Sequence, residues 1–438
     1  MGKPIALATT RLGALPMPLP DLIEIQPLLH PVRAAVKLPG SKSITNRALV
    51  LAALSEGMTT LTGALWSEDT QVMVQCLQTL GFTIHVQLDP EEHSNRTIQV
   101  QGLGGHFPPS NRQEPCDLFV GNAGTAARFL SAMLCLGQGT YRLHGVPRMH
   151  ERPQAPLFEA LRELGYRIDS PNNKLPATIH GSGPRSNSCR VSTIESSQFA
   201  SALLLCALIG RWKVEILGFN PEESPYITMT SSLIKSFPIG GGEFQIEPDA
   251  SSGSYFWGAG HLLHPPSNIT VQKWPDSGWQ IDADLPNYLP LPSSLSRADQ
   301  LGDAIMTAIV LGPFAEHPTT FTNLGRLRVQ ECERVQALRT ELAKCGAKIQ
   351  EIGDTLIIHP SPLHGATIET YHDHRMAMCF GMLGLKVAGI KIQNPSCVKK
   401  TFPDFFAKLA VSPPQGLGAT LLNGATGQTL STAELIAD

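Results

Sequence analysis

Three stretches of the chain repeat one arrangement of apolar and polar positions. Residues 73–84, 157–168 and 338–349 each contain apolar residues spaced three or four apart, then a glycine, then a short alternating segment, and 229–244 is a weaker copy. That spacing is typical of a helix packed on one face, and a glycine past the last apolar position commonly ends such a helix. A repeated helix–glycine–strand unit predicts an α/β (α+β) protein in which several sheets are each covered by helices.

Residues 258–303 interrupt this pattern where a further copy is expected. The segment contains a polar stretch at 275–279 and a proline-rich run at 285–292. Repeated prolines exclude a regular helix, because proline lacks an N–H and its ring clashes with the preceding turn. One unit of the C-terminal part is therefore predicted to be shortened. Residues 1–20, with four prolines, are expected to form a loose arm, and the tail after Pro413 is rich in Gly, Thr and Ala.

Composition narrows the class of protein. The chain has 438 residues, enough for two or three domains, and a net charge of −3 gives no electrostatic support for nucleic-acid binding. Its apolar runs are shorter than the ~18–20 residues of a membrane-spanning helix, and no secretory signal is expected. The nine cysteines contain no Cys-x-x-Cys pair. We therefore expect reduced thiols and a cytoplasmic location.

The stretch from Leu38 to Ser55 is a candidate anion site. A Pro-Gly break precedes Lys42, Ser43 and Arg47, and an apolar run of helical composition follows. The start of such a helix offers unpaired N–H groups and the positive end of the helix dipole, which favour phosphate or carboxylate. A capped surface helix with two solvated cations explains this stretch equally well. The spacing of a Walker A phosphate loop is absent.

Three further segments have the same design, which favours the anion-site interpretation. Each places small, hydroxyl or cationic residues before or within the start of a helix, and glycine allows close approach of the backbone to a ligand. Their candidate binding residues are Gly124 and Thr125 in 121–128, Arg148 in 148–153, and Ser196, Ser197 and Gln198 before an Ala/Leu-rich helix.

Acidic residues in two C-terminal segments admit a structural and a chemical interpretation. Asp303 precedes an apolar helix, a position where aspartate is most often a cap. Arg328, Glu331 and Arg334 are spaced three apart at the start of another predicted helix, so they share roughly one face. A salt-bridged surface helix is the simple interpretation of that second segment.

Residues 371–376 contain two histidines that flank an aspartate. His372 and His374 invite a metal site, but the spacing suggests no third ligand, so we expect none.

Six segments, taken in order, resemble the 5-enolpyruvylshikimate-3-phosphate synthase (3-phosphoshikimate 1-carboxyvinyltransferase) family. They run from about Ile23 to about Leu409 and read LPGSKSITNRA, GNAGTAARFL, PRMHERP, SSQFASALL, YHDHRMAM and KKTFPDFF. The resemblance implies two globular halves built from βαβαββ units. One domain would comprise 1–38 and 248–438, the other 39–247, with the active site in the cleft between them.

The resemblance also implies an activity. Enzymes of this family transfer the enolpyruvyl (carboxyvinyl) group of phosphoenolpyruvate to the 5-hydroxyl of shikimate 3-phosphate and release phosphate, in chorismate and aromatic amino-acid biosynthesis. They need no metal or other cofactor, and we expect a monomer. The family's catalytic residues correspond to Asp303 and Glu331, which move protons, and to Lys42.

The remaining site residues follow from the same resemblance. Phosphoenolpyruvate would be held by Lys42, Arg148, Arg334, Arg375 and Lys400. The phosphorylated acceptor would be held by Ser43, Arg47, Ser196, Ser197 and Gln198, with Gly124, Thr125, Tyr226, Asp303 and Gln330 completing the substrate site.

Two positions depart from the family at the acceptor site. Gln330 stands where the family usually has lysine, and Glu223 stands where it has a phosphate-binding serine, three residues before Tyr226. A carboxylate repels a phosphate, so either Glu223 points away or Ser224 supplies the missing hydroxyl. Asn323 is a candidate for a family asparagine.

Two other functions remain as alternatives. One is enolpyruvyl transfer to UDP-N-acetylglucosamine, whose family uses a Lys-Asn pair where this chain has Lys42-Ser43, and commonly a loop cysteine that is absent from 148–153. The other is a non-catalytic or altered-substrate homologue that binds phosphorylated ligands.

Overall fold

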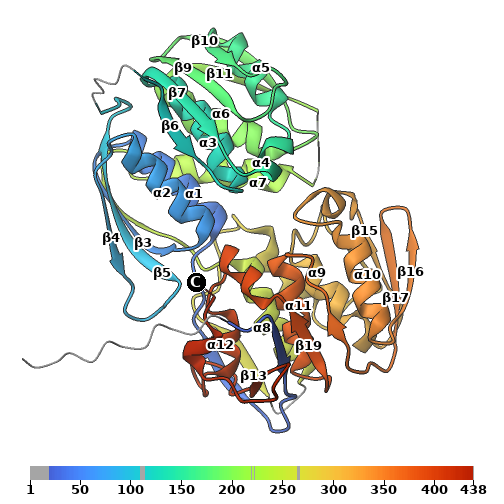
Figure 1. The fold of residues 1–438 in the computed structure, drawn as a ribbon. Helices are drawn as coiled ribbons and strands as arrows, with labels where there is room; N and C mark the ends of the chain where they lie inside the picture. The colour runs from blue at the N-terminus through green and yellow to red at the C-terminus, as the bar shows by residue number, and fades with distance from the viewer. Residues whose placement is uncertain (1–18, 109–113, 219, 221, 264–266, 438) are drawn as a thin grey trace, which may run out of the picture.

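The computed structural model describes residues 19–108, 114–218, 220, 222–263 and 267–437. They form two lobes, one above the other in Figure 1, each around its own hydrophobic core. The core of the first lobe draws on residues 44–246, and that of the second on 19–38 and 255–437. The expected two-domain α/β fold is confirmed.

The chain passes between the lobes twice, and the two crossings lie side by side. Gly40 and Pro248 form an antiparallel bridge. The Ser41 N–H donates to the Glu247 carbonyl at 2.8 Å, and the Asp249 N–H donates to the Pro39 carbonyl at 2.9 Å. The lobes are therefore joined by a two-stranded connection.

The first lobe comprises α1 (Lys42–Leu54), β3 (Glu56–Leu65), α2 (Glu68–Thr79), β4 (Ile84–Leu88), β5 (Asn95–Leu103), β6 (Cys116–Phe119), α3 (Gly124–Cys135), β7 (Gln138–His144), α4 (Pro147–Glu151), α5 (Ala155–Glu163), β8 (Arg167–Asp169), β9 (Ala177–Ser182), β10 (Asn187–Ser192), α6 (Ser197–Gly210), β11 (Trp212–Leu217), α7 (Ser224–Ser236) and β12 (Gly242–Gln245). Its sheets have the orders β12-β3-β5-β4, β6-β7-β9-β8 and β10-β11. Helices α1, α3 and α6 pack on one another inside the lobe.

The second lobe comprises β1 (Leu22–Ile25), β2 (Arg33–Val36), α8 (Ala250–Leu262), β13 (Asn268–Val271), η1 (Ile281–Tyr288), β14 (Ser294–Ser296), α9 (Ile305–Leu311), η2 (Gly312–Phe314), β15 (Thr319–Thr322), η3 (Gly325–Val329), α10 (Arg334–Lys344), β16 (Lys348–Ile352), β17 (Thr355–His359), β18 (Thr367–Ile368), α11 (His374–Gly384), β19 (Ile390–Gln393), η4 (Pro395–Lys400), α12 (Phe405–Ala410), β20 (Leu421–Asn423) and η5 (Thr432–Leu435). Its sheets have the orders β18-β19-β1-β20, β14-β15-β17-β16 and β13-β2. Helices α8, α9 and α11 pack on one another inside it.

The predicted helix–glycine–strand units are present as α2–β4, α5–β8 and α10–β16. Gly81, Gly165 and Gly346 follow these helices with φ of +96°, +91° and +95°, a conformation that side chains disfavour. In each unit the residue after the glycine donates its N–H to the carbonyl five residues earlier, which closes the helix end.

The shortened unit expected in the interrupted segment stays a prediction. Strand β13 pairs with β2 in a two-stranded sheet, and the 3-10 helix η1 overlaps the start of the proline-rich run. The first lobe has a two-stranded sheet too, β10-β11, which the sequence pattern did not indicate.

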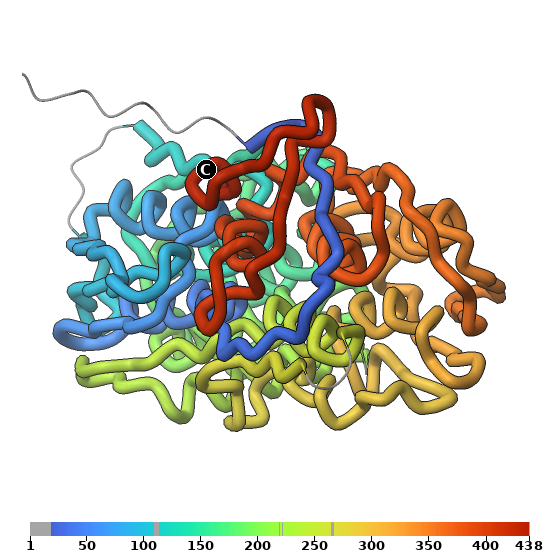
Figure 2. The backbone as a smooth tube through the Cα atoms, turned by 90° about the horizontal axis from the view of Figure 1, so that it is seen from below, coloured from blue at the N-terminus to red at the C-terminus, as the bar shows by residue number. Residues whose placement is uncertain are grey.

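The C-terminal tail belongs to the second lobe. Strand β20 pairs with β1, so β1 lies between β19 and β20, and Figure 2 shows this N-terminal segment running among C-terminal ones. Leu421, Leu430 and Leu435 are buried there. The predicted N-terminal arm lies almost wholly outside the described residues. No helix in the described part of the chain is long and apolar enough to cross a membrane.

One helix prediction was wrong. The segment that holds Arg328, Glu331 and Arg334 is not one helix, because η3 ends at Val329 and α10 begins at Arg334. The intervening turn separates the three side chains. Arg328 pairs with surface carboxylates, including Glu351 at 2.8 Å, whereas the other two face the interior.

Candidate active site

A pocket between the lobes is lined by helix N-termini. Helices α1, α3, α6 and α7 of the first lobe and α8, α10 and α11 of the second each contribute residues of their first turn. Each N-terminus presents unpaired N–H groups and a partial positive charge, so the backbone alone favours anions here. Because α1, α3 and α6 are buried among one another, the N-termini of these three helices are held in fixed positions.

Most of the predicted site residues line this pocket: Lys42, Ser43, Arg47, Thr125, Ser196, Ser197, Gln198, Tyr226, Asp303, Gln330, Glu331, Arg334 and Arg375. Lys400 lies directly behind it, with its Nζ 2.8 Å from Glu331 Oε1. Gly124 begins α3, and a side chain there would meet the guanidinium groups of Arg128 and Arg152 at 2.5 and 2.7 Å. The glycine thus makes room for two arginines.

Arg148 is outside the pocket, contrary to the prediction. Its side chain is 60% exposed and pairs with Glu151 at 2.6 Å. Arg152, four residues on, lines the pocket and donates to the Asn122 carbonyl at 3.1 Å. The single turn of α4 turns the first arginine outward, while the residue that ends the helix turns inward. The predicted segment therefore reaches the pocket through Arg152 and not through Arg148.

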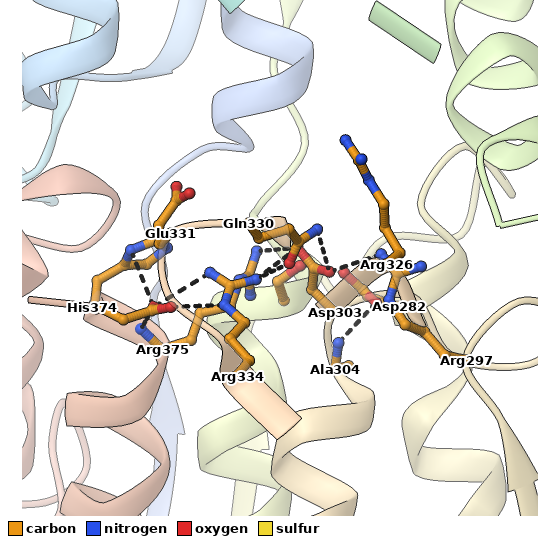
Figure 3. Close-up of polar contacts among 12 residues, drawn as sticks. Asp282, Arg297, Asp303, Ala304, Arg326, Gln330, Glu331, Arg334, His374 and Arg375 are labelled. Carbon is orange, nitrogen blue, oxygen red and sulfur yellow. Dashed lines mark hydrogen bonds and ion pairs between the residues drawn. The ribbon is translucent and has the colours of Figure 1, made fainter. Parts of the chain in front are cut away.

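Asp303 lies at the centre of a cluster of arginines (Figure 3). Its Oδ1 accepts a hydrogen bond from Arg297 at 3.1 Å, and its Oδ2 lies 3.1 Å from Arg375 and 3.8 Å from Arg334. Burial by itself would raise the pKa of this carboxyl, but the three guanidinium groups outweigh burial and hold the pKa far below its ordinary value. Asp303 is therefore ionised.

The helix-cap interpretation of Asp303 is not supported, because another aspartate takes that role. The Ala304 N–H at the start of α9 donates to Asp282 at 2.9 Å. Asp282 comes from η1, and Ser251 also donates to it. Burial, followed by the charge of Asp303, raises the pKa of Asp282. The sequence carries no signal for Asp282 or Arg297, since both lie in irregular segments without periodicity.

Glu331 lies in a separate cationic environment, beside His374 in Figure 3. Burial opposes its ionisation, but the charges of Lys400 and Arg334 hold the pKa of its carboxyl well below the usual range. Burial and then the charges of Arg375 and Lys42 hold the pKa of His374 well below its ordinary value, so this imidazole is neutral. The pocket thus holds two ionised carboxylates, and both are stabilised in part by Arg334.

Asp373 positions the second-lobe arginines. Arg334 Nε donates to Asp373 at 2.6 Å, and the same carboxylate caps α11 by accepting the Arg375 N–H at 2.9 Å. Gln330 accepts from Arg334 and donates to Asp303 at 3.5 Å, so its amide bridges a cation and an anion. Among the described residues no three His, Cys, Asp or Glu side chains form a cluster that could hold a metal.

The acceptor side of the pocket differs from the expectation. Glu223 is buried and points into the site, where it accepts the Ser197 N–H at 2.6 Å and lies 3.0 Å from Arg326. Ser224 lines a neighbouring cavity. In this structure Glu223 therefore does not point away from the site, and Ser224 does not line the pocket. Asn323 is not a lining residue either, and it donates to Ser296 at 2.9 Å.

Arg47 and Ser196 complete the acceptor side. Arg47 donates to Thr230 at 2.7 Å and to Ser201 at 3.2 Å, which fixes its guanidinium, and burial lowers its pKa to about 10. Ser196 caps α6 by accepting the Gln198 N–H at 3.2 Å. These groups are held in place by the first lobe.

Two lobes with a cation-lined cleft between them give this chain the fold of solved enolpyruvyl transferases. An EPSP synthase structure from Acinetobacter baumannii superimposes with a TM-score of 0.70 at 21% identity, covering 91% of this chain and 99% of that one. The enolpyruvyl transferase NikO from Streptomyces tendae gives a TM-score of 0.65 at 15% identity, covering 94% and 99%.

Sequence similarity places the chain within a particular family. The family model of EPSP synthase (3-phosphoshikimate 1-carboxyvinyltransferase) matches residues 29–240 and 296–409. The 3-phosphoshikimate 1-carboxyvinyltransferase of Trichormus variabilis is 38% identical over 430 residues, which cover 89% of this chain and 98% of that protein. The one from Shewanella oneidensis is 36% identical over 428 residues, covering 89% and 98%. The chain belongs to the EPSP synthase family.

Proposed function

We propose that this protein transfers the enolpyruvyl group of phosphoenolpyruvate to the 5-hydroxyl of shikimate 3-phosphate and releases phosphate, in chorismate biosynthesis. Family membership supports the reaction. The observation that carries it in this chain is the pair of ionised carboxylates, Asp303 and Glu331, in one pocket with cations from both lobes.

Phosphoenolpyruvate binds, in this proposal, between cations that the two lobes supply. Lys42 and Arg152 come from the first lobe, and Arg334, Arg375 and Lys400 from the second. Arg152 replaces Arg148 in this role. Fixed cations offset the charge of the carboxylate and of the leaving phosphate without reorganisation during the reaction.

The acceptor binds on the side of Arg47, α6 and α7. Its hydroxyl must reach the carbon that carries the phosphate of phosphoenolpyruvate, and two anions must be held close together for this. The proposed acceptor ligands are Ser43, Arg47, Ser196, Ser197, Gln198 and Tyr226. Burial and the charge of Asp303 raise the pKa of Tyr226, so its phenol stays protonated and can donate.

Proton transfer is assigned to Asp303 and Glu331. Asp303 is a weak base while Arg375, Arg297 and Arg334 surround it. Phosphoenolpyruvate bound to Arg375 and Arg334 offsets their charge, which makes Asp303 a stronger base at the moment when both substrates are present. The binding of one substrate would thereby activate the base for the other.

The bond changes then follow in two stages. Asp303 accepts the hydroxyl proton as the oxygen bonds to C2 of phosphoenolpyruvate, while the ammonium group of Lys400, 2.8 Å from Glu331, supplies the proton that Glu331 passes to the methylene carbon C3. In the second stage phosphate leaves C2 and takes up the proton held by Asp303, while the proton lost from C3 returns through Glu331 to Lys400. The enolpyruvyl ether forms, and the protein groups return to their starting state. No electrons are exchanged with a cofactor.

Phosphate release from phosphoenolpyruvate tests the proposal. Turnover is expected with shikimate 3-phosphate and not with UDP-N-acetylglucosamine. No release from folded protein with either acceptor would favour the non-catalytic alternative. Both sides of the cleft come from one chain, which supports a monomeric protein. Sedimentation would measure its oligomeric state. A cytoplasmic location fits the nine cysteines, which contain no Cys-x-x-Cys pair.

A further inference from the structure

A carboxylate of the protein itself binds the N-terminus of α6. Glu223 Oε2 accepts the Ser197 N–H at 2.6 Å, and the side chain is only 6% exposed. The same helix start, Ser196 to Gln198, is proposed above to bind the acceptor. A helix N-terminus that holds a carboxylate in this way is a working anion site.

The second oxygen of Glu223 faces an arginine of the opposite lobe. Arg326 Nε lies 3.0 Å from Glu223 Oε1, but its N–H is not aligned for a hydrogen bond. The Arg326 side chain is 23% exposed and lines the pocket. In Figure 3 it extends away from the cluster around Asp303. Arg326 is therefore a loosely paired cation that can turn to another anion in the same place.

We propose that Arg326 is a ligand of the acceptor's phosphate and that Glu223 occupies the phosphate position until the acceptor displaces it. This inference rests on the proposed function, because it needs a phosphorylated acceptor. A phosphate monoester carries about −1.5 to −2 charges near neutral pH, against −1 for the carboxylate. The phosphate is thus the stronger partner for the Ser197 N–H and for Arg326, and Glu223 must leave because two anions cannot share these donors.

The neighbouring glutamate keeps the two lobes in register during this exchange. Glu222 pairs with Arg297 at 2.8 Å across the cleft, and the Arg297 side chain is 1% exposed. This second pair does not involve the start of α6. The exchange of Glu223 for phosphate can therefore proceed while the pair of Glu222 with Arg297 still links the two lobes.

The consequence is a built-in reduction of acceptor affinity. Binding of shikimate 3-phosphate must first break the charge-assisted hydrogen bond between Glu223 and Ser197. Glu223→Gln removes the competing charge but keeps an oxygen that can accept the N–H, and Glu223→Ser supplies a hydroxyl. Each should tighten shikimate 3-phosphate by about tenfold or more. Shikimate, which lacks the phosphate, should bind both variants as it binds the wild type.

Arg326→Ala supplies the complementary test. The double variant with Glu223→Ser and Arg326→Ala should bind shikimate 3-phosphate at least about tenfold more weakly than Glu223→Ser alone. Glu195→Gln is the matched control. It removes one negative charge from an exposed position two residues before α6. Its effect on the dissociation constant should be smaller than threefold, roughly the size of a screened surface interaction.

Calorimetry with shikimate 3-phosphate and with shikimate, on variants whose folding is checked by circular dichroism, measures these changes. Unchanged or weaker binding of shikimate 3-phosphate to both Glu223 variants would overturn the inference, as would equal tightening of shikimate. If adding Arg326→Ala to Glu223→Ser costs no affinity for shikimate 3-phosphate, Arg326 is not a ligand of the acceptor's phosphate. Turnover of the wild type, measured on the same samples, separates the two proposals: absent turnover refutes the function, and normal turnover with the wrong affinity pattern refutes the inference alone.

Discussion

Asp303→Asn should abolish turnover and at the same time tighten the binding of phosphoenolpyruvate. The amide keeps the shape of the carboxylate but cannot accept a proton from the acceptor hydroxyl. Loss of a positioned base lowers the rate by about 10²- to 10⁴-fold. The tightening follows from Arg375, whose guanidinium lies 3.1 Å from Asp303 and is partly engaged by it.

The magnitude follows from that contact. A hydrogen bond to a charged group contributes about 1.5–3 kcal/mol, so release of Arg375 from its competitor should tighten phosphoenolpyruvate by about 10- to 100-fold. The free energy of unfolding, in contrast, should decrease. Removing one partner from a buried ion pair costs about 3–5 kcal/mol. Phosphoenolpyruvate supplies a replacement anion, so it should raise the melting temperature of the variant more than that of the wild type.

Three measurements check this prediction: phosphate release, calorimetry of phosphoenolpyruvate with saturating shikimate 3-phosphate, and thermal melting with and without ligand. Asp299→Asn is the control, because this exposed carboxylate four residues earlier accepts a hydrogen bond from the Ser296 hydroxyl at 2.7 Å. Turnover within tenfold of the wild type would refute the role of Asp303 as base. Weaker binding of phosphoenolpyruvate by a folded variant would refute the competition for Arg375.

Two further predictions concern the same pocket. Arg152→Ala should raise the KM for phosphoenolpyruvate at least about tenfold. Arg148→Ala loses only an exposed pair with Glu151, so its KM should stay within about twofold of the wild-type value. Equal effects of the two substitutions in steady-state kinetics would contradict the assignment of Arg152. The pKa values of Asp303 and Glu331 are lowered in the folded state, so their contribution to stability is complete above the unfolded value of about 4 and is lost as pH falls further. The melting temperature should therefore be nearly level from about pH 7 to 5 and fall below about pH 4.5, less steeply in Asp303→Asn; an equal slope in both proteins would count against it.

The repeated units could be predicted because their signals are local. Apolar spacing along α2, α5 and α10 defines a helical face, and Gly81, Gly165 and Gly346 end those helices through a backbone conformation that other residues disfavour. The start of a helix likewise exposes its N–H groups wherever it lies in the fold. The candidate anion-binding segments were therefore recognisable before any long-range contact was known.

Pairing between distant segments had no such signal. Strand β20 completes a sheet with β1, some 400 residues earlier in the chain, and its short apolar stretch alone does not indicate that partner. Register between strands depends on which faces are buried together, and the tertiary structure alone decides this.

The composition of the active site was also decided by the tertiary structure. Arg148 and Arg152 belong to one motif, and only the packing of α4 determines which of them enters the pocket. Asp282 and Arg297 come from irregular segments, and they meet Asp303 because the second lobe folds around it. The contact of Glu223 with Arg326 joins two lobes. An electrostatic interaction depends on distance in space, so the sequence alone could name the charged residues of this site but not their partners.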